Sequence, residues 1–363
     1  MLRIDKRWLV SAALSVALLF SLLVGCAGEV APTPTTPTTP TTPTTPPQTE
    51  VYNWRMQSIQ ITGTAQMEGT LQGCELAHKM SNGAINIEVF PSEQLVPSSE
   101  IFKALGDGVI ELADTWCGYC AGQVPEIEMY DGGMHFTLET LEERWSWYYH
   151  EGAEDALNEM LAPYNVRWLG PKFMNHAILV SRVPLTSVDD FNGLKIRTSG
   201  CNAIFFEALG AKTVTVPTGE IYTALQQGLV DAATWSGEDM AAAMGLHEVA
   251  PYLIEPCYKL FADGCWMMNL DTYNELPAHL QEIVRIGAQY HGLQCLSLTT
   301  YGDAVGREKF KEVCYLTSPD DLAKFQAAAL VVMHTIAGKN ENAAKGFEML
   351  SDFLNERGYT WVK

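Results

Sequence analysis

The sequence predicts an α/β protein built from two lobes of similar plan. In the segment 191–237, apolar strand-like stretches alternate with helical ones in the order strand, helix, strand, helix, strand, and the segment 51–114 has the same order. The length of 363 residues is enough for about two domains. Strands separated by helices form parallel sheets with right-handed crossovers, and ligands bind such sheets beyond the carboxyl ends of the strands.

The first fifty residues are expected to be a targeting region and a tether. Three basic residues precede the apolar run Leu9–Val24, which predicts a signal peptide over residues 1–25. The run ends in Leu23-Val24-Gly25-Cys26, which resembles the lipobox of bacterial lipoproteins, so Cys26 is expected to carry a lipid anchor. Residues 26–50 are rich in Pro and Thr, which cannot form a core, and predict an extended tether.

The elements of the first lobe are predicted from periodicity and capping signals. Strands are expected where apolar and polar residues alternate or where apolar residues follow one another. They are Tyr52–Gln57, Ile85–Val89 and Val109–Asp114. The expected helices are one that ends before Asn82, one at Glu100–Leu105 and a long one at Leu138–Leu161. The aromatic residues of the long helix are expected to be core residues: Trp145, Trp147, Tyr148 and Tyr149.

The second lobe is predicted in the same way. Its expected strands are Leu194–Arg197, Thr213–Val216 and Leu229–Thr234. Its expected helices are Asn202–Leu209 and Glu220–Gln227. Further helices, one up to about Gly338 and one at Ala343–Arg357, are expected to brace the two lobes.

Candidate binding residues follow the predicted strands at their carboxyl ends. In the second lobe, Arg197 and the run Thr234-Trp235-Ser236 fall at such ends and should face one pocket. In the first lobe, the residues at comparable positions are Gln57, Ser58, Trp116 and Tyr119. Arginine binds a carboxylate through two parallel hydrogen bonds, a geometry that lysine cannot reproduce.

The segment Phe191–Gly237 resembles the solute-binding subunits of TRAP (tripartite ATP-independent periplasmic) transporters, the DctP family. The resemblance rests on the strand Gly193-Leu194-Lys195-Ile196-Arg197 and on the helix and strand between Gly219 and Asp231. The tryptophan that follows this strand, Trp235, makes the chain most similar to the 2-oxoacid-binding, TakP-like branch of the family. The resemblance runs from Val51 to the C-terminus and implies a two-lobed, periplasmic-binding-protein-like fold with a ligand cleft between the lobes and long bracing helices.

The resemblance also implies how the lobes and the site are arranged. Lobe I would hold residues 51–174 and 263–302, and lobe II residues 175–262 and 303–363. Arg197 would clamp the carboxylate of a small organic acid (2-oxo, hydroxy or other), and lobe closure would prepare its delivery to the membrane subunits. Asn175 and His176 would contact the ligand, although His176 could equally be an interior histidine. This branch also contains dimers built through the C-terminal helix, which the tail here resembles, so the resemblance leaves both a monomer and a homodimer open.

No cofactor is expected. In the 2-oxoacid branch, a glutamate before the tryptophan helps to hold a cation, often sodium. Here that position is Thr234, which is neutral and a weak ligand for a hard cation. The sequence therefore favours binding of a plain carboxylate or a hydroxy acid without a cation.

Nine cysteines are present, of which Cys26 is assigned to the lipid anchor. Cys117-Gly118-Tyr119-Cys120 is the one pair with redox-motif spacing, and it fits either a dithiol site or half of a zinc site. The acidic stretch that follows is a poor start for a helix that would activate a thiol. No second Cys-x-x-Cys or His-x-x-x-His motif completes a metal site. A lipid-anchored periplasmic dithiol oxidoreductase is thus an alternative function.

Charge and the missing motifs narrow the function classes. A net charge of −20 disfavours nucleic acid and an anionic membrane surface as partners. The sequence contains neither a Gly-x-Ser-x-Gly elbow nor a phosphate-binding Gly-x-x-x-x-Gly-Lys-[Ser/Thr] loop. A binding protein outside the cytoplasm is therefore expected rather than an enzyme. A solute-sensing receptor lobe is the second alternative, disfavoured by the lack of a later membrane span or signalling domain.

Overall fold

The computed structural model describes residues 50–174, 176–256 and 262–362, which belong to one compact unit. The expected signal peptide, Cys26, nearly all of the tether and Asn175 lie outside the described residues. Among the described helices, none is both long and apolar enough to span a membrane.

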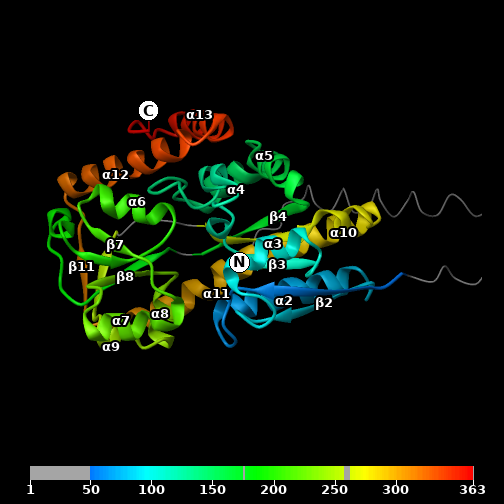
Figure 1. Cartoon of the computed structure of the whole chain (residues 1–363), viewed down its shortest axis with the longest axis horizontal. Helices are drawn as coiled ribbons and strands as arrows, with labels where there is room; N and C mark the ends of the chain where they lie inside the picture. Colours follow the sequence, from blue (N-terminus) through cyan, green and yellow to red (C-terminus); the bar gives the residue numbers. More distant parts are fainter. Residues whose placement is uncertain (1–49, 175, 257–261, 363) are drawn as a thin grey trace, which may run out of the picture. The chain divides into compact units, whose positions relative to one another are not determined.

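The first sheet has five strands in the order β2-β1-β3-β10-β4 (Figure 1). Their bounds are β1 Tyr52–Ser58, β2 Ile85–Phe90, β3 Leu112–Thr115, β4 Val166–Phe173 and β10 Ala262–Asn269. Strand β1 pairs in parallel with β2 and β3, whereas β10 is antiparallel to β3 and β4.

The second sheet has six strands in the order β11-β9-β5-β8-β6-β7. Their bounds are β5 Ile178–Ser181, β6 Lys195–Arg197, β7 Lys212–Val214, β8 Ala232–Trp235, β9 Tyr252–Glu255 and β11 Glu312–Tyr315. Strand β6 pairs in parallel with β7 and β8, and β5 is antiparallel to β8 and β9.

The two sheets share one plan. Each sheet contains a parallel triplet of strands, β1, β2 and β3 in the first and β6, β7 and β8 in the second. The first strand of each triplet lies between the other two, and an antiparallel strand pairs with the third. That antiparallel strand comes from a crossing of the chain: β5 directly follows β4 of the first sheet, and β10 follows β9 of the second. The predicted two-lobed α/β fold with a parallel strand triplet in each lobe is confirmed.

Helices cover both sheets (Figure 1). Their bounds are α2 Ala65–Met80, α3 Ile101–Gly106, α4 Leu141–Tyr149, α5 Ala153–Leu161, α6 Cys201–Ala208, α7 Ile221–Gln227, α8 Glu238–Ala243, α9 Leu246–Val249, α10 Leu270–Asn274, α11 Ala278–Arg307, α12 Pro319–Ala337 and α13 Glu341–Glu356. Short 3-10 turns include η2 (Cys117–Tyr119) and η3 (Pro125–Met129).

The expected long helix Leu138–Leu161 is wrong in one respect, because the structure divides it into α4 and α5. Gly152 lies between them with φ of +91°, a left-handed conformation that interrupts a helix and that glycine adopts easily. Thr140 and Glu143 form a capping box at the start of α4. Trp147 and Tyr148 are fully buried, as predicted, so the aromatic face packs into the core.

Helix α11 connects the two lobes. It packs on α2 and β4 of the first lobe and on α8 of the second. Glycines allow the close approach: a Cβ on Gly292 would lie 2.3 Å from the Pro171 carbonyl oxygen, and one on Gly306 would lie 2.5 Å from the Glu238 carbonyl oxygen. The lobe boundary expected at residues 302/303 falls inside this continuous helix.

The two C-terminal helices differ in their contacts. Helix α12 packs on α6 of the second lobe and on η3 of the first, whereas α13 packs on η3 and on α12. The Phe353 ring of α13 lies 5.9 Å from the ring of Trp147 in α4. Residues 303–363 were expected to join lobe II, but this last helix lies against lobe I.

Candidate ligand-binding site

Arg197 ends strand β6 and is half-buried. Its Nε donates a hydrogen bond to the Val216 carbonyl oxygen (3.1 Å), and its Nη1 donates to the Thr234 carbonyl oxygen (3.4 Å). Its guanidinium carbon lies 5.6 Å from the centre of the Trp235 ring, within the range of a cation–π contact. These contacts orient the cation at the carboxyl end of the sheet, where the strand order predicted it.

Trp235 is the last residue of β8, next to β6. Its ring is partly buried against the core of the second lobe. The indole Nε1 is buried and makes no hydrogen bond with any described residue. A buried N–H without an acceptor is costly, so this group is a candidate donor to a ligand. Ser236 follows and is partly exposed.

Thr234 lies inside the lobe. Its side chain is 5% exposed, and its Oγ1 lies 3.2 Å from Thr198 Oγ1 and 3.4 Å from the Arg197 carbonyl oxygen. The hydroxyl therefore links β8 to β6.

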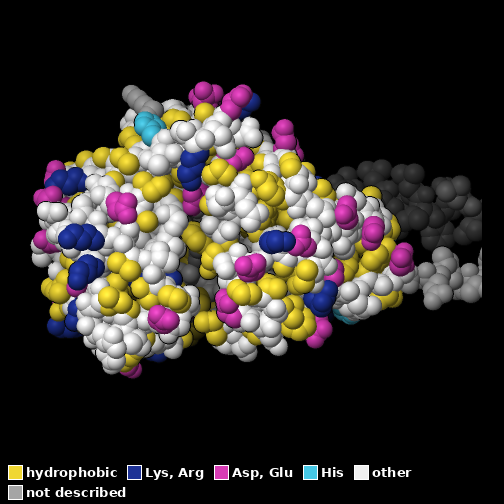
Figure 2. Space-filling model, viewed as in Figure 1, with side chains coloured by type: hydrophobic (Ala, Val, Ile, Leu, Met, Phe, Trp, Pro, Cys, Tyr) yellow, Lys and Arg dark blue, Asp and Glu magenta, His cyan; other side chains and the backbone are white. Residues whose placement is uncertain are grey.

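Trp116 follows strand β3 of the first lobe and reaches the second lobe. Its ring packs edge-on against Tyr119, with ring centres 5.5 Å apart. A Cβ on Gly200, at the start of α6, would lie only 3.0 Å from the Trp116 ring. Its Nε1 is buried and has no hydrogen-bond partner among the described residues. Figure 2 shows a hollow in the surface between the parts of the molecule that hold the two sheets.

Gln57 and Ser58 lie inside the first lobe, because both side chains are fully buried. The Gln57 amide donates to the Ser58 and Pro91 carbonyl oxygens and accepts from the Leu95 N–H. Ser58 Oγ donates to Asp114 Oδ2 at 2.7 Å. Both side chains therefore hold the loop after β2 and the end of β3, and the structure does not bring them to Arg197.

Comparison with known proteins identifies the family. The model of the bacterial extracellular solute-binding protein family 7, DctP, matches residues 58–340. The chain belongs to the DctP family. Its predicted membership of this family is thus confirmed.

Curated relatives carry names of binding proteins. A monocarboxylate 2-oxoacid-binding periplasmic protein, all3028 of Nostoc sp., is 29% identical over 246 residues, which is 64% of this chain and 64% of that protein. The C4-dicarboxylate-binding periplasmic protein DctP of Rhodobacter capsulatus is 30% identical over 171 residues, 46% of this chain and 50% of that protein. The match to each of these relatives thus spans less than two thirds of its length.

Solved structures share the fold. A TRAP periplasmic solute-binding protein from Rhodobacter sphaeroides, in an apo open form, has a TM-score of 0.69 and 25% identity, and the match covers 85% of this chain and 99% of that one. One from Pseudoalteromonas atlantica with bound sodium and pyruvate has a TM-score of 0.77 and 21% identity, covering 86% and 96%. These relatives are described as solute-binding proteins, not as enzymes.

His176 of this DctP-family chain belongs to an ionic cluster. Its Nε2 lies 3.2 Å from Glu238 Oε1 and 3.8 Å from Glu255 Oε1. Arg307 Nη1 lies 3.0 Å from the same Glu238 oxygen and also pairs with Glu255. With Asp303, these four residues are called the hinge cluster below. Sequence reasoning missed it because its members are far apart in the chain and belong to no motif.

The hinge cluster contains groups with shifted pKa values, among them His176 and Asp303. Burial alone would lower the pKa of His176, but the Glu238 carboxylate outweighs it and the net direction is upward. Burial, and then the charge of Glu238, raises the pKa of Asp303 to about 7. The Asp239 N–H donates to Asp303 Oδ1 at 3.2 Å. The cluster is therefore sensitive to protonation near neutral pH.

Structures of similar solute-binding proteins contain bound sodium or calcium. The Thr234 hydroxyl is neutral and is already within hydrogen-bonding distance of two protein oxygens. In the hinge cluster, the Glu238 and Glu255 carboxylates already face the Arg307 cation and the His176 imidazole. The described residues therefore do not fit a hard-cation site at Thr234.

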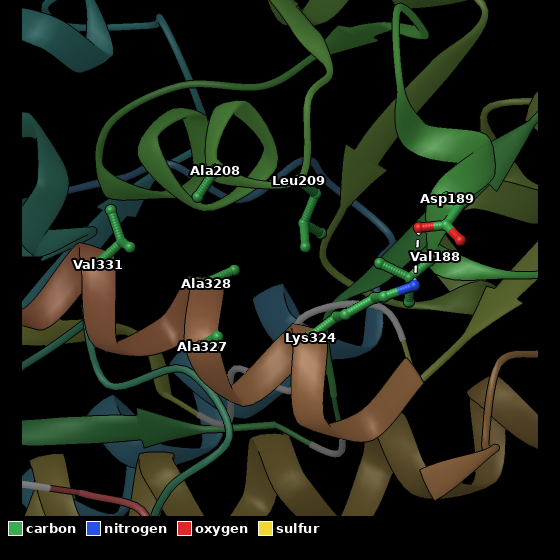
Figure 3. A pocket seen from close by; sticks show the side chains of 8 residues that line it. All are labelled: Val188, Asp189, Ala208, Leu209, Lys324, Ala327, Ala328 and Val331. Atoms are coloured by element: carbon green, nitrogen blue, oxygen red, sulfur yellow. Dashed lines mark hydrogen bonds and ion pairs between the residues drawn. The ribbon is translucent and has the colours of Figure 1, made fainter. Parts of the chain in front are cut away.

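A separate groove lies between α6 and α12 (Figure 3). The residues that line it are Val188, Asp189, Ala208, Leu209, Lys324, Ala327, Ala328 and Val331. Lys324 Nζ pairs with Asp189 Oδ1 across it at 2.7 Å. None of the predicted ligand residues lines this groove, so it is distinct from the candidate site.

Proposed function

We propose that this chain is the extracytoplasmic solute-binding subunit of a TRAP transporter and captures a small organic acid between its two lobes. The observation that carries the proposal is the placement of Arg197 at the carboxyl end of β6, against Trp235. Membership of the DctP family and the names of several relatives, which include carboxylate-binding proteins, support the same class of ligand.

Arg197 would bind the carboxylate. The whole chain carries a net charge of −20, so an anion needs a local positive charge to bind. The planar guanidinium is held from one side by the Val216 and Thr234 carbonyl oxygens and faces an indole ring. An arginine oriented in this way loses less side-chain entropy when it pairs with a carboxylate.

The two indoles would complete the polar contacts. Trp235 Nε1 and Trp116 Nε1 are buried donors without acceptors among the described residues. One belongs to each lobe, so an acid that accepts from both would hold the lobes together. Ser236 and Tyr119 lie next to them in the chain, and Asn175 and His176 lie at the first crossing between the lobes. These four are proposed as further ligand contacts.

Binding would not need a cation. A relative with bound pyruvate also has bound sodium, but Thr234 here offers only a neutral hydroxyl that contacts its own lobe. A plain carboxylate or a hydroxy acid matches two N–H donors and a guanidinium without a metal ion. The affinity of this chain should therefore be independent of sodium and calcium.

Delivery would follow from lobe closure and anchoring. Closure around the acid would present one surface to the membrane subunits, as hinge motions do in binding proteins. Lipidation at Cys26 and the tether of residues 26–50 would keep the two-lobed unit near the membrane. The dithiol alternative loses support, because burial raises the pKa of both Cys117 and Cys120, whereas a reactive thiol needs a lowered pKa and access.

A thermal-shift screen tests the proposal. The purified chain would be heated with small mono- and dicarboxylates, each with sodium, with calcium, or with potassium as the sole cation. A ligand at 100 times its dissociation constant adds ~2.7 kcal/mol of stability, which is easily detected. A shift from one acid class in all three salts is expected. A shift from neutral solutes alone would refute the carboxylate assignment.

A further inference from the structure

The cysteine pair Cys117 and Cys120 has partners that the sequence did not reveal. Cys265, on β10, places its Sγ 3.4 Å from the Sγ of Cys117, although 148 residues separate the two. Cys117 Sγ also donates to Asp131 Oδ2 at 3.0 Å. One ligand atom from each of Cys117, Asp131 and Cys265 lies within 4.8 Å of the others.

This cluster lies entirely within the protein. Cys117, Cys120, Cys265 and Asp131 are all 0% exposed. The Cys120 N–H donates to the Cys117 carbonyl oxygen at 2.9 Å, so Cys120 lies one turn further along the same segment. Two thiols and one carboxylate thus converge at a buried point, and a third buried thiol lies in the adjacent turn.

We propose that Cys117, Cys120, Cys265 and Asp131 form a structural site for one soft divalent metal ion of the Zn²⁺ class. Four ligands with sulfur in the majority are the composition of closed, tetrahedral zinc sites. The Cys-x-x-Cys spacing of the first two is also common among zinc ligands. The sequence pattern did not reveal the other two ligands: Cys265 comes from the distant strand β10, and Asp131 comes from the loop after η3.

The spacing of the atoms favours a metal over a disulfide. Two sulfurs bound to one zinc at ~2.3 Å in a tetrahedron are about 3.8 Å apart. The Cys117 and Cys265 sulfurs, at 3.4 Å, would need to separate by only a few tenths of an ångström. A disulfide bond of ~2.05 Å would require them to approach by more than an ångström instead.

Neighbouring groups suit such a site. The Tyr148 hydroxyl is buried and has no hydrogen-bond partner among the described residues. Its pKa is raised by burial and then by the charges of Asp131, Cys117 and Cys265. A buried hydroxyl of this kind is the type of group that orients metal ligands.

A buried cation lies close to the backbone beside Cys265. Lys172 is 1% exposed, and its Nζ would lie 3.2 Å from a Cβ on Gly264, the residue before Cys265. Three thiolates and a carboxylate exceed the charge of one divalent ion by two negative charges, and the ammonium group of Lys172 offsets part of that excess.

Binding would release protons. Without metal, Cys117 is a thiol that donates a hydrogen bond to the Asp131 carboxylate. A metal ion would replace the proton on each of the three sulfurs, and the ion and the thiolates would undergo no change of oxidation state. Metal affinity should therefore rise with pH.

The site would fix one wall of the candidate ligand cleft. Trp116 and Tyr119 share the segment of Cys117 and Cys120. A Cβ on Gly132, beside Asp131, would lie 3.7 Å from Trp116 Nε1. Metal would thus tie the segment after β3 to β10 and to the loop after η3, and hold Trp116 in place.

Metal analysis of the whole chain tests the proposal. The protein would be purified with a phosphine reductant and without chelators, its zinc content measured, and the zinc replaced by Co²⁺ for absorption spectroscopy. About one zinc ion per chain and intense thiolate-to-cobalt bands are expected. Cys117→Ser and Cys265→Ser should each weaken zinc retention at least ~10-fold. Cys295→Ser is the control, because this buried thiol contacts Gln66 instead.

Three outcomes would overturn the proposal. They are a wild-type protein that holds no zinc even after refolding in its presence, unchanged retention in folded Cys117→Ser, or peptide mapping that finds Cys117 in a disulfide in the isolated protein. Where a serine variant does not fold, the cobalt spectrum of the wild type decides, since a spectrum without thiolate bands contradicts the ligand set.

Discussion

At the scale of single residues, the binding face of the second lobe combines a cation with an indole. Arg197 and Trp235 end neighbouring parallel strands, so their side chains meet at one edge of the sheet. Carbonyl oxygens fix the guanidinium, and the indole N–H has no acceptor among the described residues. An acid that accepts hydrogen bonds from both would give the indole N–H its acceptor and would place its negative charge at the guanidinium.

Trp235→Phe should weaken ligand binding without removing the ring beneath Arg197. The change removes the N–H and the five-membered ring but keeps a six-membered aromatic ring, and a lost hydrogen bond to a charged group costs ~1.5–3 kcal/mol. Titration calorimetry with the best acid from the screen would measure the loss. Trp54→Phe is the control, since Trp54 lies in a core cluster of the first lobe. Equal affinity of wild type and Trp235→Phe would show that the indole N–H does not contact the ligand.

Some residues of the candidate site could be predicted and others could not. Arg197 and Trp235 follow strands that the periodicity locates, and their strands pair as expected. Gln57 and Ser58 follow the same rule, yet both are buried and bonded within the lobe. The rule that ligands bind at the carboxyl ends of parallel strands locates the end of a strand but not the direction of a side chain. That direction depends on the loops packed around it, which are held by distant contacts such as the hydrogen bond from Gln57 to the Pro91 carbonyl oxygen.

At the scale of secondary-structure elements, the hinge cluster lies where the connections between the lobes meet. His176 belongs to the crossing from β4 to β5, and Glu255 ends β9 before the return crossing. Asp303 and Arg307 lie on α11, the third connection. The ion pairs among them therefore join all three connections, and a change of protonation would act on each.

The pH dependence of stability should report this cluster. The pKa of Asp303 is raised from 3.8 to about 7 in the folded state, so the folded state keeps a proton that the unfolded chain loses. Stability is therefore lost as pH rises from about 4 to 7. Asp303→Asn cannot lose a proton, so its stability relative to wild type should rise over that range, by ~1.4 kcal/mol per unit of pKa shift at most.

Urea unfolding at several pH values would check this, with His176→Gln as a second probe. The pKa of His176 is also raised, so its contribution is complete below about 6.5 and is lost at higher pH. His176→Gln should therefore destabilise the protein more at pH 6 than at pH 8. Parallel curves for wild type and both variants would contradict a titrating cluster.

Gly306→Ala should loosen the packing of α11 on α8. A Cβ there would lie 2.5 Å from the Glu238 carbonyl group, so backbone must move, at a cost of ~1–3 kcal/mol. Denaturant unfolding would measure the loss. Gly219→Ala is the control, because a Cβ at Gly219 meets nothing within 4 Å. A variant at Gly306 as stable as this control would refute close packing.

At the scale of the whole molecule, the order of elements within each lobe was predictable from the sequence. The placement of strands β5 and β10, which enter a sheet after the chain crosses between the lobes, was not. Hydrophobic periodicity located the strand triplets of both lobes because each triplet is continuous in sequence. Strands β5 and β10 each join a sheet beside strands far away in the chain. The division of the predicted long helix at Gly152 was also missed, since buried apolar residues such as Leu157 and Leu161 continue at helical spacing beyond the break. Contacts between distant segments decide the strand order, whereas the helix break is a local feature of Gly152.

The central claim is that Arg197 clamps an acid between the lobes, and titration calorimetry tests it most directly. Wild type, Arg197→Ala and Lys195→Ala would be titrated with the acid that gives the largest thermal shift. Lys195 is an exposed cation on the same strand, so it controls for net charge. We predict that Arg197→Ala loses ~2–5 kcal/mol of binding free energy while Lys195→Ala binds like wild type. Wild-type affinity in Arg197→Ala would contradict the account.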